Sequence, residues 1–223
     1  MKIFFFSLFL FFYSYTYAEE FKLEKIIDGL NKPWSLSFID DQNIVLTEKS
    51  GKLLYANLIN RNINEIKHNL SLINLGQGGL LDVLYKDKNI YISYSENRGN
   101  WETSTSVAKG SFNKKTIRFK NIFSAEPPID SGYHFGSRLV IKDNHLYITA
   151  GERGQGMIAQ DFTKHPGSII RINLDGSIPK NNPKFKGKKD WLPEIFQIGV
   201  RNPQGLAYSP FDKKIYLTNH GAK

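Results

Sequence analysis

Apolar and β-branched residues recur along this chain in short runs bounded by turn residues. No long segment repeats its apolar positions with the helical period of about 3.6 residues. Runs of this kind are typical of β-strands. We predict strands at residues 35–38, 43–47, 53–57, 89–95, 116–122, 146–150, 168–173 and 214–218. The pattern therefore predicts an all-β protein.

A longer repeat contains several of these runs: an apolar segment, a polar turn and a β-rich strand follow one another four times. The second strands begin at Ile44, Ile90, Leu146 and Ile215, which are 46, 56 and 69 residues apart. This spacing is near the roughly 40–50 residues of a propeller blade. A β-sandwich would give turn signals every 8–12 residues or so without the longer period. We predict a β-propeller with about four blades in this chain, and we assign the excess length to loops, chiefly residues 96–105 and 181–191.

Three repeats carry a polar, glycine-flanked corner just before their first strand, at residues 76–82, 132–139 and 199–206. The second corner holds His134, whose imidazole titrates near neutral pH and suits a general base. Each corner alone is more typical of an ordinary turn than of a catalytic site. In a propeller, however, the three corners would gather at one end of the central channel and form one site.

Residues 1–18 have the features of a secretory signal peptide: Lys2 near the start, an apolar run over residues 3–13, and small residues ending at Ala18. The apolar run is shorter than the roughly 20 residues that span a bilayer. We therefore expect a mature domain at residues 19–223, periplasmic or secreted, with no membrane span after cleavage. The chain has no cysteine, so core burial, helped by a bound ion, would have to stabilise it in an oxidising compartment.

The chain is basic, with 30 Lys and Arg against 21 Asp and Glu. Removal of Lys2 with the leader leaves 29 basic side chains and a net charge of +8. The densest basic group lies in a loop rich in Pro, Gly and Asn, which favours a solvated face over a nucleic-acid groove. It consists of Lys184, Lys186, Lys188 and Lys189. We expect no nucleic-acid partner.

The polar corners, together with further short motifs in a fixed order, resemble the soluble glucose/sorbosone dehydrogenases, above all their periplasmic aldose sugar dehydrogenase branch. The motifs lie at residues 76–82, 94–95, 134–139, 159–161, 174–183, 201–205 and 220–221, and the resemblance runs from about residue 31 to the end. It implies a six-bladed propeller that holds pyrroloquinoline quinone (PQQ) and calcium (Ca²⁺) over the channel mouth. It also implies an aldose sugar as substrate and an external electron acceptor as partner.

By this resemblance His134 is the general base that takes the proton of the anomeric hydroxyl, and it lies beside the cofactor. Arg201 is similar to the guanidinium that faces the quinone oxygens and stabilises the charge arriving there. Asn202 would donate to the same edge of the cofactor, and Gln77 would contact it. Hydride transfer from the anomeric carbon would make the protein a quinoprotein oxidoreductase.

For calcium, the resemblance points to the backbone carbonyls of Gly221 and Ala222, since a hard cation prefers oxygen ligands. The family usually has Gly-Pro there, and this chain has Gly-Ala. A second departure is Tyr133, which stands where glucose-oxidising members carry an acidic residue, so their substrate preference does not transfer. The later blades, with the cationic groups that bind the cofactor's carboxylates, have no counterpart in these residues. We therefore expect a truncated chain, and the family's activity for the full-length gene product rather than for these 223 residues.

Two other classes of function fit the repeat pattern. A calcium-dependent propeller lactonase or hydrolase would need several inward-facing carboxylates, for which Asp82, Glu152 and Asp161 are the candidates, although each is also typical of a turn or a cap. A propeller that only binds a partner would keep the blades without needing His134 and Arg201. Because one fold hosts many functions, the choice rests on the site residues.

Overall fold

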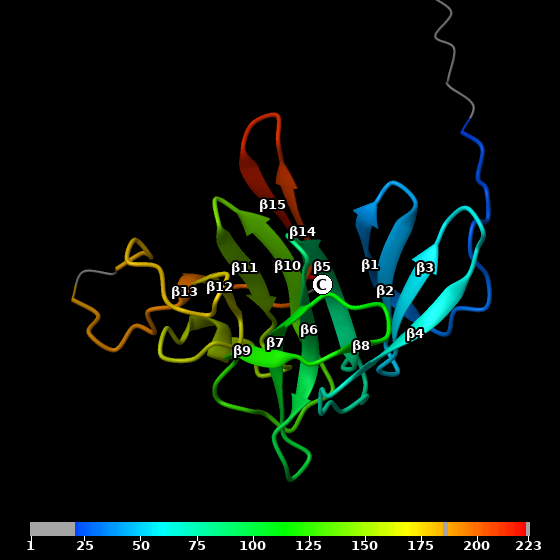
Figure 1. The fold of residues 1–223 in the computed structure, drawn as a ribbon. Coiled ribbons are helices and arrows are strands. Elements are labelled where there is room, and N and C mark those ends of the chain that lie inside the picture. Colours follow the sequence, from blue (N-terminus) through cyan, green and yellow to red (C-terminus); the bar gives the residue numbers. More distant parts are fainter. Residues whose placement is uncertain (1–20, 185–186, 222–223) are drawn as a thin grey trace, which may run out of the picture.

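The computed structural model describes residues 21–184 and 187–221, and the predicted leader lies outside them. Within this part of the chain the structure is almost entirely β, with one short 3₁₀ helix, η1 (Gly156–Gln160) (Figure 1). None of the helices in the described part is long and apolar enough to cross a membrane. The all-β prediction is confirmed.

The strands form four sheets that follow the order of the chain, except that β8 joins the first sheet. The first sheet consists of β1 (Pro33–Asp40), β2 (Asn43–Glu48), β3 (Leu53–Asn57) and β4 (Ile63–His68), with β8 (Thr116–Ile117) parallel to β4. The second consists of β5 (Leu80–Lys86), β6 (Asn89–Asn97), β7 (Thr103–Ser111) and β9 (Lys120–Ser124). The third consists of β10 (Gly136–Lys142), β11 (His145–Ala150), β12 (Ser168–Asn173) and β13 (Ile195–Ile198), and the fourth of β14 (Pro203–Ser209) and β15 (Lys214–Asn219).

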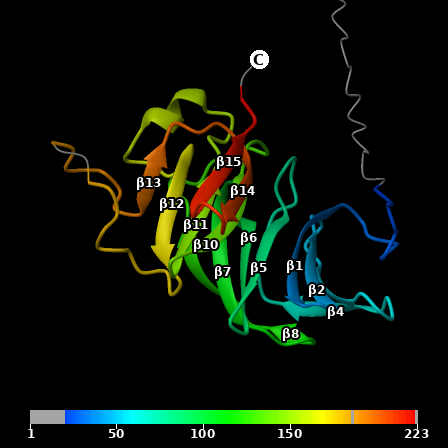
Figure 2. The ribbon, with the colours of Figure 1, turned by 90° about the horizontal axis from the view of Figure 1, so that it is seen from above.

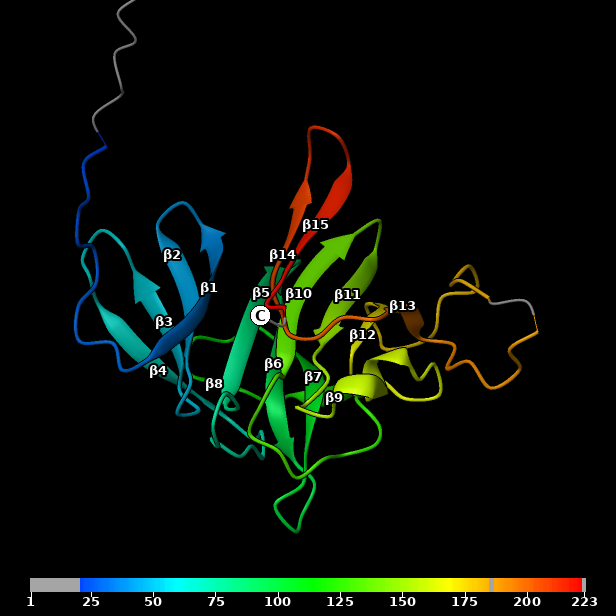
Figure 3. The same ribbon diagram turned by 180° about the vertical axis from the view of Figure 1, so that it is seen from behind.

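The four predicted repeats correspond to these four sheets. Neighbouring strands within a sheet are antiparallel, apart from β4 and β8. The first strands of successive sheets contact one another, β1 with β5, β5 with β10 and β10 with β14 (Figure 2). This is the arrangement of a β-propeller, and the hairpin of β14 and β15 projects from the rest of the molecule (Figures 1 and 3).

Alternate residues of the strands fill the spaces between neighbouring sheets, because successive side chains of a strand point to opposite faces. In β6, Ile90 and Ile92 belong to the core between the first and second sheets. Tyr91, between them, belongs to the core between the second and third sheets, with Ile148. These side chains are almost fully buried, so each blade is stabilised by its neighbours rather than by itself.

Strand β7 was not predicted, because its first four residues are Thr and Ser and residues 96–105 read as a loop. Their hydroxyls are buried and have partners instead: Ser104 Oγ lies 2.7 Å from the carbonyl oxygen of Ala125, and Thr105 Oγ1 lies 2.8 Å from that of Phe135. A buried hydroxyl with such a partner avoids the cost of desolvation. The predicted run at residues 116–122 is likewise divided between β8 and β9.

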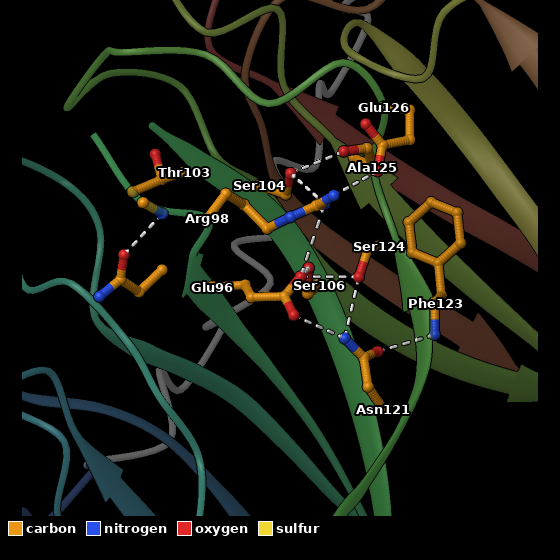
Figure 4. Close-up of polar contacts among 12 residues, drawn as sticks. Glu96, Arg98, Thr103, Ser104, Ser106, Asn121, Phe123, Ser124, Ala125 and Glu126 are labelled. Carbon is orange, nitrogen blue, oxygen red and sulfur yellow. Dashed lines mark hydrogen bonds and ion pairs between the residues drawn. The ribbon is translucent and has the colours of Figure 1, made fainter. Parts of the chain in front are cut away.

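Polar side chains shown in Figure 4 connect β7 to its neighbouring segments. The carboxylate of Glu96 accepts hydrogen bonds from Ser106 (2.8 Å) and Ser124 (2.7 Å). Arg98 donates to Glu126 at 2.6 Å and to Ser104 at 3.1 Å. Charged and hydroxyl groups thus connect β6, β7 and the segment after β9.

Apolar side chains remain exposed on the two outermost sheets. Leu36 and Phe38 of β1 are 53% and 58% exposed, and Tyr216 of β15 is 55% exposed. Leu36 and Phe38 share one face of β1 because they are two residues apart. This face lines an apolar cavity of about 620 Å³ with Ile44 and Leu46.

We expect the 223-residue chain to self-associate at micromolar concentration, because exposed apolar faces and sheet edges favour contact between molecules. Sedimentation velocity measures this, and replacing Leu36 and Phe38 together by Ser should shift the distribution towards monomer. Ile59→Ser, in the exposed turn after β3, serves as the control and should leave it unchanged. A monodisperse monomer of the parent chain would contradict this expectation.

Candidate functional site

A cavity of about 420 Å³ opens at the end of the molecule where the first strands of the sheets begin. All four sheets contribute to its lining: Trp34 from the first, Gln77 before the second, Gly136 from the third and Gln204 from the fourth. Lys49, after β2, adds an ammonium group. The predicted gathering of the polar corners at one end is therefore observed.

The corner that carries His134 packs directly on the corner that carries Gln77. The His134 amide donates to Gln77 Oε1 at 2.8 Å, and the Gln77 amide donates to the oxygen of Gly132 at 2.7 Å. A Cβ added to Gly76 would lie 2.4 Å from that oxygen, so only glycine permits the approach. His134 itself has a φ of 49°, in the left-handed region, a conformation that the surrounding contacts must hold.

The imidazole of His134 is paired with the carboxylate of Glu152. Nδ1 lies 2.5 Å from Glu152 Oε1, and Glu152 is only 3% exposed. The other carboxylate oxygen accepts from the Gly156 amide at 3.1 Å. Beside an ionised carboxylate, which can only accept, a neutral imidazole carries its hydrogen on Nδ1 and keeps its lone pair on Nε2. His134 is thus oriented as a proton acceptor at Nε2.

Arg201 lies beside this pair. Its Nε is 3.8 Å from Glu152 Oε1, and the Glu152 amide donates to the Arg201 carbonyl at 2.8 Å. Nη1 donates to the carbonyls of His220 at 3.1 Å and Gly221 at 3.3 Å. The side chain is 36% exposed, so the guanidinium remains available to an anionic group.

Asn202 is almost fully buried and connects the fourth sheet to the third. Its Oδ1 accepts from the Gly136 amide at 3.2 Å and from Gln204 Nε2 at 2.9 Å. Because both bonds use the oxygen, the amide nitrogen is the atom left to donate to a ligand in the cavity that Asn202 lines. The structure thus brings His134, Gln77, Arg201 and Asn202 together at one end of the propeller.

Only one of the two predicted calcium ligands, Gly221, lies within the described residues. Ala222 lies outside the described residues, and the Gly221 carbonyl accepts from the Arg201 guanidinium. In the described part of the chain, no group of three or more His, Asp and Glu side chains could hold a metal ion. Calcium at Gly221 and Ala222 therefore stays a prediction.

The carboxylates considered for a calcium-dependent hydrolase have separate roles. Asp82 is buried and bonded to Ser35 Oγ (2.5 Å) and the Leu139 amide (2.8 Å), and burial raises its pKa. Asp161 caps a turn through Thr163, whose hydroxyl and amide bonds lower its pKa to about 2. Glu152 is bonded to His134 Nδ1. No observation here favours the hydrolase.

Sequence reasoning missed the role of Glu152, which we had considered only as a metal ligand or a turn residue. It also missed Arg153, which is buried next to it. The available signal was position: both follow β11 directly, in a stretch flanked by Gly151 and Gly154. A Cβ on Gly151 would lie 2.0 Å from the His134 oxygen, and no local pattern reveals that approach between distant segments.

Comparisons with known proteins agree on one family. The model of the family described as Glucose / Sorbosone dehydrogenase matches residues 30–223. The aldose sugar dehydrogenase YliI of Escherichia coli is 32% identical over 211 residues, covering 90% of this chain and 57% of that protein. Quinoprotein glucose dehydrogenase B of Acinetobacter calcoaceticus is 32% identical over 233 residues, covering 88% of this chain and 48% of that protein.

Solved structures agree with the fold. The soluble aldose sugar dehydrogenase of Escherichia coli, in its apo form, superposes with a TM-score of 0.83 at 32% identity, over 89% of this chain and 60% of that one. The PQQ-bound aldose sugar dehydrogenase of Streptomyces coelicolor gives 0.76 at 22% identity, over 90% and 60%, which supports the fold alone. The chain spans about half the length of the relatives it matches. It belongs to the glucose/sorbosone dehydrogenase family.

Proposed function

We propose that the complete protein is a quinoprotein dehydrogenase that oxidises the anomeric hydroxyl of aldose sugars and passes the electrons to an external acceptor. The observation that carries this proposal is the His134–Glu152 pair, 2.5 Å apart and beside Arg201. The His134 amide is bonded to Gln77, which lines the cavity where the sheets converge. The names of the relatives support the same class of reaction.

The residues around the cavity fit part of pyrroloquinoline quinone, which is planar and carries three carboxylates, since they supply one ammonium group, Lys49. The lining contains Lys49 and the side-chain amides of Gln77, Asn202 and Gln204, and it contains no carboxylate. Its volume, about 420 Å³, is in the range of small-molecule sites, roughly 300–1,000 Å³. When bound, the quinone supplies the electron sink for the hydride that leaves the sugar.

His134 would take the proton of the anomeric hydroxyl at Nε2. Glu152 holds the ring by its Nδ1 hydrogen and stabilises the positive charge that the imidazole acquires. Arg201, partly exposed and next to Glu152, would bind the anionic oxygens that develop opposite the base. Gln77 keeps the His134 loop in place through its carbonyl oxygen.

For calcium we propose the main-chain carbonyls of Gly221 and Ala222. The Gly221 oxygen already accepts from Arg201 at 3.3 Å. A cation there would have to share that oxygen with the guanidinium or displace it, and this would free Arg201 to face an anionic ligand. Calcium binding and the orientation of Arg201 are therefore coupled in this proposal.

We further propose that the protein acts outside the cytoplasm, after removal of residues 1–18. N-terminal sequencing of the protein recovered from the periplasm or medium should begin near Glu19, because Ala18 ends the small-residue stretch that a signal peptidase reads. An intact Met1 on the protein in the cytoplasm would contradict the proposal.

His134→Ala, in the complete protein reconstituted with calcium and the quinone, should lower kcat for dye-linked aldose oxidation by about 10²-fold, the scale of lost general-base assistance. Binding of the quinone, followed by titration, should change little. His145→Ala, at the start of β11 and at the opposite end of that strand from Ala150, is the control and should keep parental activity. Equal turnover of His134→Ala and the parent would show that the proton goes elsewhere.

Glu152→Gln should lower kcat by about 10-fold to 10²-fold, because the amide no longer stabilises the charged imidazole and can present its NH₂ group to Nδ1. The matched control is Glu194→Gln, which alters a second His–Glu contact, His165 Nε2 to Glu194 Oε1 at 2.9 Å, away from the cavity. Steady-state kinetics compares the two variants. A loss of kcat as large in Glu194→Gln as in Glu152→Gln would assign both effects to general destabilisation.

A further inference from the structure

Arg153 is a buried arginine next to Glu152, and it is only 2% exposed. Its guanidinium donates from Nε to the Tyr133 carbonyl at 3.0 Å and from Nη1 to the Thr103 carbonyl at 2.8 Å. Nη2 donates to Thr103 Oγ1 at 2.6 Å and to the Ser131 carbonyl. A planar guanidinium can bind several acceptors in fixed directions, which an ammonium group cannot do.

These contacts surround His134. The carbonyls of Ser131 and Tyr133 precede it, and the ring of Phe135, which follows it, lies 3.7 Å from the guanidinium carbon. The Arg153 amide also lies 3.4 Å from the His134 carbonyl. The segment at residues 131–135 is therefore wrapped around one side chain, and that segment includes the left-handed backbone of His134.

The far side of the guanidinium is held by β7. Thr103 exchanges backbone hydrogen bonds with Ile129 at 3.1 and 3.0 Å. Its neighbour Ser104 donates to the Ala125 carbonyl and accepts from Arg98, as Figure 4 shows. Backbone hydrogen bonds thus hold Thr103 in the sheet, and Arg153 links Thr103 to the His134 loop.

All of these hydrogen-bond acceptors are uncharged. Burial lowers the pKa of Arg153 to about 10, so the group stays charged at neutral pH, and the nearby Glu152 carboxylate opposes the shift. A buried charge with neutral partners is costly to desolvate. Arg153 is instead fixed by the groups it binds, the carbonyls and the hydroxyl around the His134 loop.

We propose that Arg153 is a positioning residue for the base: it fixes the loop of His134, so that Nε2 faces the substrate. This inference rests on the proposed function, in which His134 is the base. It does not require Arg153 to touch substrate or cofactor.

The test compares Arg153→Lys with Arg171→Lys in the complete protein. Arg171 is also buried, with its guanidinium carbon 5.1 Å from the ring of Phe196 and its nitrogens bonded to Asn181 and Asn182, away from the cavity. Both variants should lower Tm. Only Arg153→Lys should lower kcat, by about tenfold or more, since small displacements of a catalytic group are costly.

Spectra of ¹⁵N-labelled histidine provide a readout independent of activity, with the His134 signals assigned by His134→Gln. In the parent they should show hydrogen on Nδ1 of His134, and in Arg153→Lys a mixture of tautomers. Arg171→Lys should retain the parental pattern. Unchanged kcat and unchanged His134 signals in Arg153→Lys would overturn the proposal, as would equal losses in Arg171→Lys.

If the parent protein oxidises no aldose, the proposed function fails, and the spectra still test the positioning role. If Arg153→Lys does not fold, Thr103→Val removes one acceptor of the guanidinium and keeps Arg153 itself. It should shift the His134 signals in the same direction by a smaller amount. Parental signals in Thr103→Val would also overturn the proposal.

Discussion

The carboxylate of Asp82 joins the first strands of three neighbouring sheets, and the geometry of the site depends on that junction. Asp82 lies in β5, accepts from Ser35 of β1 at 2.5 Å and from the Leu139 amide of β10 at 2.8 Å, and lies 3.6 Å from Arg138. Strands of different sheets share no ladder of backbone hydrogen bonds, so side chains must set their relative positions. Burial raises the pKa of Asp82, and the hydrogen bonds from Ser35 and the Leu139 amide act in the opposite direction.

Other hydroxyl groups repeat this connection from sheet to sheet. Thr47 donates to the Leu81 carbonyl at 2.6 Å, Ser93 to the Ser137 carbonyl at 2.6 Å and Thr149 to the Pro203 carbonyl at 3.2 Å. The apolar cores between sheets supply most of the burial, whereas these polar contacts determine how the inner strands are aligned. Alignment matters because the corners with His134 and Arg201 directly precede those strands.

The site combines backbone strain with buried charge. His134 has left-handed backbone geometry, and Glu152 and Arg153 lie almost without exposure beneath it. Each feature is unfavourable alone, and each is stabilised by the others: Arg153 binds the loop carbonyls, Glu152 binds the ring, and Gly151 permits the close approach of the His134 carbonyl. This mutual dependence is typical of functional sites, where strain persists because the surroundings over-determine it.

The sequence by itself determined the strand class, the four repeats and the residues of the polar corners, because period-two alternation and glycine-flanked turns are local properties of the chain. It also led to His134, Gln77, Arg201 and Asn202, which the structure places together. Strand β7 escaped detection because its first four buried positions are Thr and Ser, whose burial depends on partners in distant segments. The roles of Glu152 and Arg153 were decided only by tertiary structure, since their partners, His134, Tyr133 and Thr103, are 18, 20 and 50 residues away. Contacts across such separations arise from the packing of the sheets, which no local pattern encodes.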